Sequence, residues 1–481
     1  MDPSEFRKHG HALVDWIAEY FAHPERYPVL PRVAPGDVRR ALPSSAPESG
    51  EPFDDILRDF ERILVPALTH WNHPGFFAYF ASTGSAPAVL AEFLAAAVNQ
   101  QAMLWRTSPA ATELEEVALG WLRELVGLPP AFTGVIYDTA SISTLHALAA
   151  AREGAVPGVR VHGLARRGVG PMRLYCSEHA HSSVDKAVML LGFGHESLLR
   201  IQADGQFRMR ADALEDAIDR DLADGIRPVA VVATAGTTST TSVDPIDAIA
   251  AICGDRGVWL HVDAAYAGVT AMLPDRRALF AGWERADSIV INPHKWLFVP
   301  VDLSAFYCRR MDLLRGAFSL VPDFLRTSDG ATNLMDTGIQ LGRRFRALKL
   351  WAVLRHFGAA EIRAVLTEHL RLAQVFAEWV DAHPDLERVA PVPFSVVCFR
   401  ASPGALELSE PAADAFNEQL LDRINATGEV FLSHTRVNGR FVIRLAIGHL
   451  RTTDEHVRRA WELVTAHTAA LKNTYRATPS G

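Results

Sequence analysis

Lys295 lies in the setting that most favours chemistry in this sequence. In the segment SIVINPHKW an apolar, strand-like run ends at Asn292, and His294 and Lys295 follow almost at once. Ligands of open α/β sheets bind at the carboxyl ends of the parallel strands. The apolar residues 296–298 would partly shield the amine from water, which lowers its pKa and makes it a nucleophile towards a carbonyl. The alternative is a lysine that extends from a strand end into solvent.

A carboxylate occupies a similar position at Asp263, where the apolar run GVWLHV ends. Small residues follow it, among them Ala265, and these would let a flat ring lie close to the backbone. Pyridoxal phosphate needs such a pair, because a lysine attaches the cofactor covalently and a carboxylate keeps the ring nitrogen protonated. Taken alone, Asp263 could equally cap a helix or hold a turn.

A third segment suits a phosphate group. Thr139, Ala140 and Ser141 follow the run GVIY and open a predicted helix. Backbone N–H groups and hydroxyls there would face an anion at the positive end of the helix dipole. Threonine and serine are also ordinary helix N-caps, so this segment is a weak signal by itself. A dinucleotide fingerprint is absent, since the only GxG, at 168–170, is followed by proline.

Two histidines, His179 and His181, follow the strand-like run MRLYC. Their spacing could suit a metal, but no third ligand completes a recognisable set, so we predict no metal site. An imidazole stacked on a cofactor ring is the better functional interpretation.

These segments are separated by helical stretches, which predicts an α/β fold for residues 71–350. The strand-like runs are apolar throughout, as expected of a mostly parallel sheet covered on both faces; they are GVIYDT, MRLYCS, RPVAVVATA, GVWLHVDA, DSIVINP and LSAFYC. Residues 351–481 predict a smaller α+β domain, with helices over 361–382 and 411–426 and a hairpin that turns at Asn438-Gly439.

Residues 1–70 predict two amphipathic helices, over about 4–22 and 53–68, joined by a proline-rich segment. Two such helices cannot bury both apolar faces by themselves. We therefore expect this segment to pack on a partner subunit or on the main body of the chain.

The composition excludes several classes of protein. The net charge is −8 and no basic run is interleaved with aromatic residues, so we predict no nucleic-acid partner. No apolar run approaches the ~18 residues that a membrane span needs, and the first residues lack the pattern of a secretory signal. Four widely spaced cysteines without a CxxC pair indicate reduced thiols, so the expected location is the cytoplasm.

Taken together, the sequence resembles the group II pyridoxal-phosphate-dependent decarboxylases, with the aromatic L-amino acid decarboxylases closest. The likeness covers nearly the whole chain, in the order that the family has. It is carried by HPGFFAYF, WRTSPAATELE, TASISTLHALAAAR, AHSSVDKA, ATAGTTSTTSVDPI, WLHVDAAYAG, NPHKW and LGRRFRALKLW.

This resemblance implies fold type I, the aspartate aminotransferase-like fold, and a homodimer whose site is built where two subunits meet. Lys295 then corresponds to the lysine that binds pyridoxal 5′-phosphate, Asp263 to the partner of the ring nitrogen, Ala265 to a contact beneath the ring and His181 to the imidazole stacked over it. Further cofactor contacts are implied for Thr139, Ala140, Ser141, Thr238, Asn292 and His294. Ser82 corresponds to a hydroxyl near the substrate carboxylate.

The sequence departs from the family pattern at Phe324, where the decarboxylases carry a loop tyrosine that is thought to protonate Cα of the product. The same exchange in plant aromatic acetaldehyde synthases accompanies decarboxylation coupled to oxidative deamination. The sequence is thus compatible with two products, the amine and the aldehyde. We favour decarboxylation to the amine, with His181 or a water as the proton donor, and keep the aldehyde as the alternative.

The pocket also departs from the animal enzymes, because Met103 replaces an aromatic residue and Gln101 adds polarity. Methionine is adaptable, so an aromatic or similarly bulky L-amino acid is the expected substrate. An aminotransferase, a glutamate decarboxylase and a catalytically silent scaffold are the rivals. The segments HVDAAYAG and NPHKW favour a decarboxylase over the first, and Trp296 disfavours the second. A silent scaffold predicts the loss of Lys295 or Asp263, and both are present.

Overall fold

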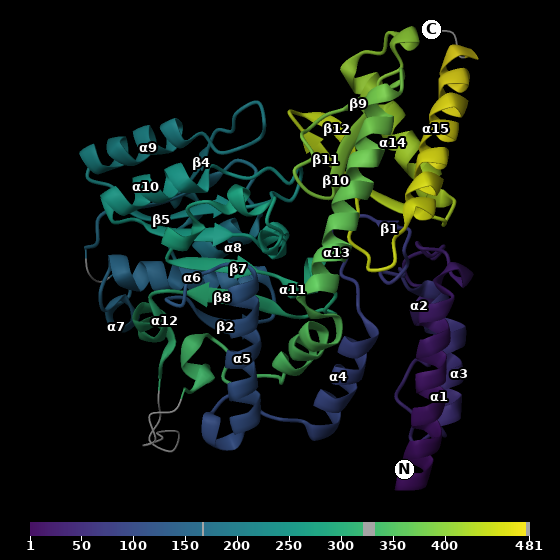
Figure 1. The fold of residues 1–481 in the computed structure, drawn as a ribbon, viewed down its shortest axis with the longest axis horizontal. Coiled ribbons are helices and arrows are strands. Elements are labelled where there is room, and N and C mark those ends of the chain that lie inside the picture. Colours follow the sequence, from purple (N-terminus) through teal and green to yellow (C-terminus); the bar gives the residue numbers. More distant parts are fainter. Residues whose placement is uncertain (166–167, 321–331, 478–481) are drawn as a thin grey trace. The chain divides into compact units, whose positions relative to one another are not determined.

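The computed structural model describes residues 1–165, 168–320 and 332–477 (Figure 1). The chain forms two compact units. The larger comprises Ser82–Ala377 and Ala390–Cys398, and the smaller comprises Met1–Ala81, Glu378–Val389 and Phe399–Gly481. The smaller unit is thus assembled from both ends of the chain.

A seven-stranded sheet forms the centre of the larger unit, in the order β2-β8-β7-β6-β5-β3-β4. Neighbouring strands are parallel from β7 to β4, and β8 is antiparallel to both β7 and β2. The strands are β2 (Thr133–Tyr137), β3 (Met172–Ser177), β4 (Leu198–Ile201), β5 (Arg227–Thr234), β6 (Trp259–Asp263), β7 (Ser288–Ile291) and β8 (Ser304–Cys308). The expected mostly parallel α/β sheet is confirmed.

The central strands are buried at every position because helices flank the sheet (Figure 1). One of these helices, α6, contacts five of the strands, and its small buried residues around Ala149 let it lie close to them. The helices of this unit are α4 (Ala86–Val98), α5 (Pro109–Leu125), α6 (Ala140–Ala155), α7 (Val159–His162), α8 (Ser183–Leu190), α9 (Ala211–Ala223), α10 (Ile246–Arg256), α11 (Pro293–Trp296), α12 (Met311–Phe318) and most of α13 (Ala347–Ala382).

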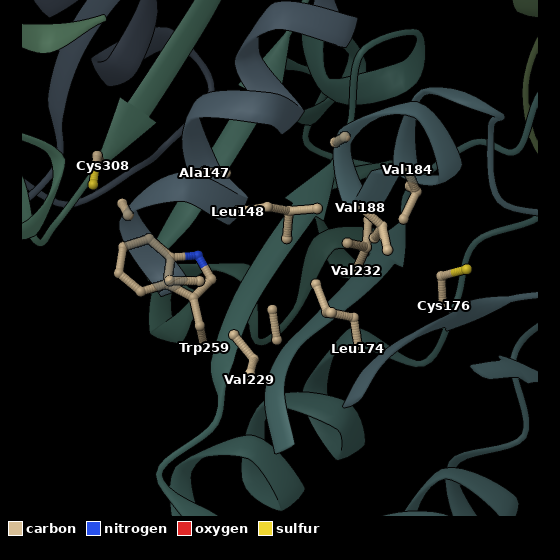
Figure 2. Close-up of a cluster of buried hydrophobic side chains, with 14 of the residues drawn as sticks. Ala147, Leu148, Leu174, Cys176, Val184, Val188, Val229, Val232, Trp259 and Cys308 are labelled. Atoms are coloured by element: carbon tan, nitrogen blue, oxygen red, sulfur yellow. The ribbon is translucent and has the colours of Figure 1, made fainter. Parts of the chain in front are cut away.

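The apolar core between α6, α8 and the sheet is shown in Figure 2. Leu148 of α6 and Val188 of α8 pack there against Leu174 of β3 and Val232 of β5, and all four are fully buried. Two of the four cysteines, Cys176 and Cys308, belong to this core. All four cysteines are buried, and none forms a disulfide within the described residues.

The smaller unit contains a five-stranded sheet in the order β1-β11-β12-β10-β9. The hairpin expected at Asn438-Gly439 is confirmed: β11 and β12 pair antiparallel, and both turn residues have positive φ. The strands are β1 (Phe76–Phe77), β9 (Leu386–Arg388), β10 (Val396–Ala401), β11 (Phe431–Val437) and β12 (Arg440–Ala446), and the helices are α1 (Pro3–Ala22), α2 (Asp37–Ala41), α3 (Phe53–Asp59), α14 (Glu410–Ala426) and α15 (Asp454–Ala477).

The N-terminal segment is joined to this sheet, because β1 pairs in parallel with β11. Of the two helices expected there, α1 agrees closely, and α3 continues as a π-helical turn to Leu64. Packing of residues 1–70 on a partner subunit stays a prediction. Among the described helices, none is both long and apolar enough to cross a membrane.

Buried histidines predict loss of stability in mild acid. Burial lowers the pKa of His146 to about 3 and that of His261 to about 4, against about 6.5 in an unfolded chain. As the pH falls below about 6.5 the unfolded chain binds more protons than the folded chain, so the free energy of unfolding decreases. Each histidine contributes up to about 2 kcal/mol between about pH 6.5 and pH 5.

We expect the calorimetric unfolding temperature to drop over this range, and less steeply in His146→Gln. His11→Gln, at an exposed position of α1, is the matched control and should keep the wild-type slope. An unfolding temperature that stays constant down to about pH 5 would contradict this account.

Candidate active site

The sheet brings Asp263 and the Lys295 segment to the same edge. Asp263 is the last residue of β6 and pairs with Val290 of the neighbouring parallel strand β7. The chain leaves β7 at Ile291 and reaches Lys295 within the short helix α11. Because both strands end at one edge, the carboxylate and the amine belong to one site.

Lys295 is partly accessible, and burial lowers the pKa of its amine while the charge of Asp263 opposes that shift. The next residue, Trp296, is fully buried and stacks on Tyr266 with ring centroids 4.8 Å apart. Its indole Nε1 donates to His369 Nδ1 at 2.9 Å. Lys295 therefore extends from a backbone that its apolar neighbour anchors in the core.

Asp263 is 6% exposed, and its Oδ1 accepts a hydrogen bond from the Ala265 N–H at 3.0 Å. The carbonyl of Ala265 accepts in turn from the Asn292 N–H at 3.0 Å. Asp263 does hold a turn, and that turn links the end of β6 directly to the lysine segment.

His181 is electrostatically coupled to this pair. Burial lowers the pKa of its ring, with Lys295 acting in the same direction and Asp263 opposing. Its Nδ1 accepts from the Ser183 N–H at 3.1 Å, so the neutral ring carries its proton on Nε2. The ring of His179 instead packs against Phe207. Of the two predicted histidines, His181 is the one coupled to the lysine and the aspartate.

The first turn of α6 is suited to an anion. Its N-cap Thr139 makes no side-chain capping bond. The N–H groups of Ala140 and Ser141 have no acceptor within the described residues, and all three residues are half-buried. Unsatisfied donors at the positive end of a helix dipole favour a phosphate.

Asn292 and His294 add polar groups beside the lysine. Asn292 is 1% exposed, its Oδ1 has no partner within the described residues, and its Nδ2 lies 3.3 Å from His294 Nε2. Burial, followed by Lys295, lowers the pKa of His294 to about 4, and its Nδ1 accepts from the Leu303 N–H. His294 is therefore neutral near pH 7.

Thr238 is exposed in the loop that follows β5. The same loop contains Gly236, at φ +94°, where a Cβ would lie 2.8 Å from Cβ of Ala267. Glycine at this position lets the loop approach the segment that follows Asp263.

The residues predicted to contact the substrate lie in different environments. Ser82 is half-buried, and Met103 packs with Leu104 and Met335. Gln101 accepts from the Arg343 N–H through its Oε1 at 2.6 Å, so one end of its amide is used to hold this segment. Phe324 lies outside the described residues.

These residues fit pyridoxal phosphate. A lysine and a carboxylate lie at neighbouring strand ends, and unsatisfied donors and an orphaned buried amide oxygen suit a polar ligand. Residues 35–402 match the pyridoxal-dependent decarboxylase conserved domain. The chain belongs to the pyridoxal-dependent decarboxylase family. It is a pyridoxal-phosphate-dependent amino acid decarboxylase, which confirms the expected enzyme class and cofactor.

Similar proteins span the full length of this decarboxylase. It is 40% identical to an aromatic-L-amino-acid decarboxylase of Sus scrofa over 98% of each chain. It is 38% identical to a phenylacetaldehyde synthase of a Rosa hybrid cultivar, over 99% of this chain and 96% of the relative. The Oryza sativa TDC solved with PLP and tryptamine superposes with a TM-score of 0.94 at 37% identity, over 98% of this chain and 99% of that one.

A buried ion pair that was not predicted from the sequence supports the site of this decarboxylase. Arg343 Nη2 donates to Glu115 Oε1 at 2.7 Å and to the Ile136 carbonyl, and its Nη1 donates to the Ala102 carbonyl. Glu115 Oε1 also accepts from the Ile136 N–H. The signal was present in LGRRFRALKLW, where arginines interrupt an apolar stretch, but their partners are far away in sequence.

We expect Lys295→Ala to abolish turnover of this decarboxylase and to remove the visible absorbance of covalently attached cofactor, because the variant lacks the amine that would attach it. Asp263→Asn should lower the rate by at least about a hundredfold, since the ring nitrogen loses its anionic partner. Absorbance spectra and CO₂ release measure both effects. Lys8→Ala, at an exposed lysine of α1, is the control; wild-type turnover by Lys295→Ala would disprove the assignment.

Proposed function

We propose that the enzyme removes the carboxyl group of aromatic or similarly bulky L-amino acids and releases the amine and CO₂. The observation that carries the proposal is Lys295 beside Asp263 at adjacent strand ends, with the amine pKa lowered by burial. The substrate class is supported by the similarity to the porcine aromatic-L-amino-acid decarboxylase and to the Oryza sativa TDC with tryptamine.

Each cofactor group has a matching set of residues. Lys295 would hold the aldehyde carbon and Asp263 the ring nitrogen, while Ala265 and His181 would contact the two ring faces. The phosphate would be bound by Thr139, Ala140, Ser141, Thr238, Asn292 and His294. Bound pyridoxal phosphate supplies an electron sink for the electron pair left when the carboxylate departs as CO₂.

The protein supplies the proton chemistry. Burial lowers the pKa of the Lys295 amine, so this amine is neutral more often near pH 7 than the amine of an exposed lysine. A neutral amine can take up a proton during turnover. His181 has its proton on Nε2 in the neutral state, so it can donate that proton towards Cα of the product. Phe324 has no proton to give.

The substrate side would be formed by Ser82, Gln101 and Met103. Ser82 supplies a hydroxyl for the substrate carboxylate, and the flexible thioether of Met103 adapts to an aromatic ring. The backbone N–H of Arg343 donates to Gln101 Oε1 and holds this side chain in place. The Nε2 group of Gln101 is then the polar group that faces the substrate.

The second candidate product is the aldehyde, formed by decarboxylation with oxidative deamination by O₂, which also yields ammonia and hydrogen peroxide. The observation that favours it is Phe324, together with the similarity to the phenylacetaldehyde synthase. We prefer the amine because His181 lies at the site as a second proton source.

The product test compares wild type, Phe324→Tyr and His181→Gln with an aromatic L-amino acid in air. If the amine is the product, it should match CO₂ mole for mole without oxygen uptake, and Phe324→Tyr should change only the rate. Loss of the imidazole should slow turnover by about a hundredfold or more, the usual contribution of general acid catalysis.

Peroxide released in proportion to CO₂ by the wild type, and shifted to amine by Phe324→Tyr, would instead establish the aldehyde. An unchanged rate in His181→Gln would contradict its role as proton donor.

We also propose a homodimer that forms through α4. Leu90, Phe93, Leu94 and Val98 on this helix are about half exposed or more, a concentration of apolar side chains that is uncommon on a monomer. Ile339 and Leu341 are exposed as well, and Arg344 of the same segment pairs with Glu92 of α4. Together these residues form one apolar face suited to a second copy of the chain.

We expect Leu94→Asp to shift the sedimentation coefficient from that of a dimer to that of a monomer, because a charge would be buried in the contact. Leu222→Asp, at a similarly exposed leucine of α9, should leave the assembly unchanged. A wild-type monomer, or a Leu94→Asp dimer of normal stability, would count against this surface.

The four cysteines are buried and form no disulfide within the described residues, which is consistent with a reducing compartment. We propose the cytoplasm as the location.

A further inference from the structure

Arg346 bridges two carboxylates that belong to different loops of the site. Its side chain is 8% exposed. Nε donates to Asp302 Oδ1 at 3.0 Å, and Nη2 donates to Asp302 Oδ2 and to Asp138 Oδ1. A planar guanidinium can satisfy two carboxylates at once, which a lysine ammonium does less well.

The two carboxylates lie next to cofactor-binding segments. Asp138 immediately precedes Thr139, the N-cap of α6. Asp302 immediately precedes Leu303, whose N–H donates to His294 Nδ1. Arg346 therefore ties the first turn of α6 to the loop that follows Lys295.

The two carboxylates depend on Arg346 to different degrees. Asp302 also pairs with Arg344, at 3.2 Å, so it keeps a cation if Arg346 is removed. Asp138 accepts otherwise from the neutral Gln340 Nε2 at 2.7 Å, and within the described residues its ion pair is with Arg346 alone. Removal of Arg346 would leave Asp138 as an uncompensated negative charge one residue from the proposed phosphate site.

We propose that Arg346 is a positioning residue for the cofactor phosphate, which acts by neutralising Asp138 and by joining its loop to Asp302. The inference rests on the assignment of the α6 N-terminus as the phosphate site. A phosphate dianion and an unpaired carboxylate at neighbouring positions repel each other strongly where little water screens them. With Arg346 in place the charge of Asp138 is neutralised, so the N–H donors of the helix terminus bind the phosphate without this repulsion.

The rival interpretation is that Arg346 only stabilises the fold, as buried ion pairs at other places do. The two interpretations predict different effects of a second substitution, at Asp138, on cofactor binding. If the charge of Asp138 is the cause of weakened cofactor binding, its removal should restore binding. If Arg346 only stabilises the fold, removal of Asp138 adds a second defect.

The experiment follows cofactor release from the holoenzyme by visible circular dichroism after transfer to buffer without pyridoxal phosphate, and so needs no activity measurement. We expect Arg346→Gln to release the cofactor at least about tenfold faster than wild type, and Arg346→Lys to be intermediate. In the double variant Asp138→Asn/Arg346→Gln the rate should return to within about threefold of wild type.

Arg344→Gln is the matched control, since it removes a neighbouring arginine that pairs with Asp302 and Glu92 but not with Asp138. It should release the cofactor at close to the wild-type rate. Asp138→Asn alone keeps the test decisive if Arg346→Gln fails to fold, because it should retain the cofactor at least as well as wild type.

A wild-type release rate in Arg346→Gln, a double variant that releases as fast as Arg346→Gln, or a tenfold faster release in Asp138→Asn would each overturn the proposal. A wild-type protein that binds no pyridoxal phosphate would instead count against the site assignment itself.

Discussion

The direction and register of three parallel strands determine where the chemistry can occur. Thr234 of β5, Asp263 of β6 and Val290 of β7 lie side by side at one edge of the sheet. The loops that follow β5, β6 and β7 start from buried strand ends, so their first residues cannot shift without disturbing the core. The carboxylate of Asp263 and the amine of Lys295 acquire their relative position from backbone hydrogen bonds between these strands and the segments that follow them.

Around this edge the protein uses neutral and charged groups for different purposes. Burial lowers the pKa values of His146, His261 and His294, so they serve as neutral hydrogen-bond partners. Arginine side chains instead hold segments together: Arg343 joins β2 to the segment 101–103, and Arg346 joins two loops. The buried charges of Arg343 and Arg346 are thereby compensated by carboxylates, as the low dielectric requires.

The local features of the site were accessible from the sequence, and its long-range ties were not. Asp263 ends an apolar run and Lys295 follows another closely, so both strands and the reactive residues after them could be predicted from the hydrophobic pattern. The antiparallel direction of β8 has no comparable signal, because a buried strand has the same apolar pattern in either direction. Likewise Glu115 and Arg343 are 228 residues apart, and neither residue indicates its partner. The short strand β4 and the helices α4 and α15 were not predicted, and α4 is apolar almost throughout and has no clear polar face.

The reversal of β8 also affects how Lys295 can move. The lysine lies in a connection whose two ends, Ile291 and Ser304, belong to adjacent hydrogen-bonded strands, and Ile291 pairs directly with Ala305. Within the connection, Trp296 is stacked in the core and the Phe298 carbonyl accepts from Ser85 Oγ. The backbone beside the amine thus has little conformational entropy left to lose. Movement of the Lys295 amine is reduced to rotations about the lysine's own side-chain bonds, and these take place on a timescale far shorter than that of any loop rearrangement.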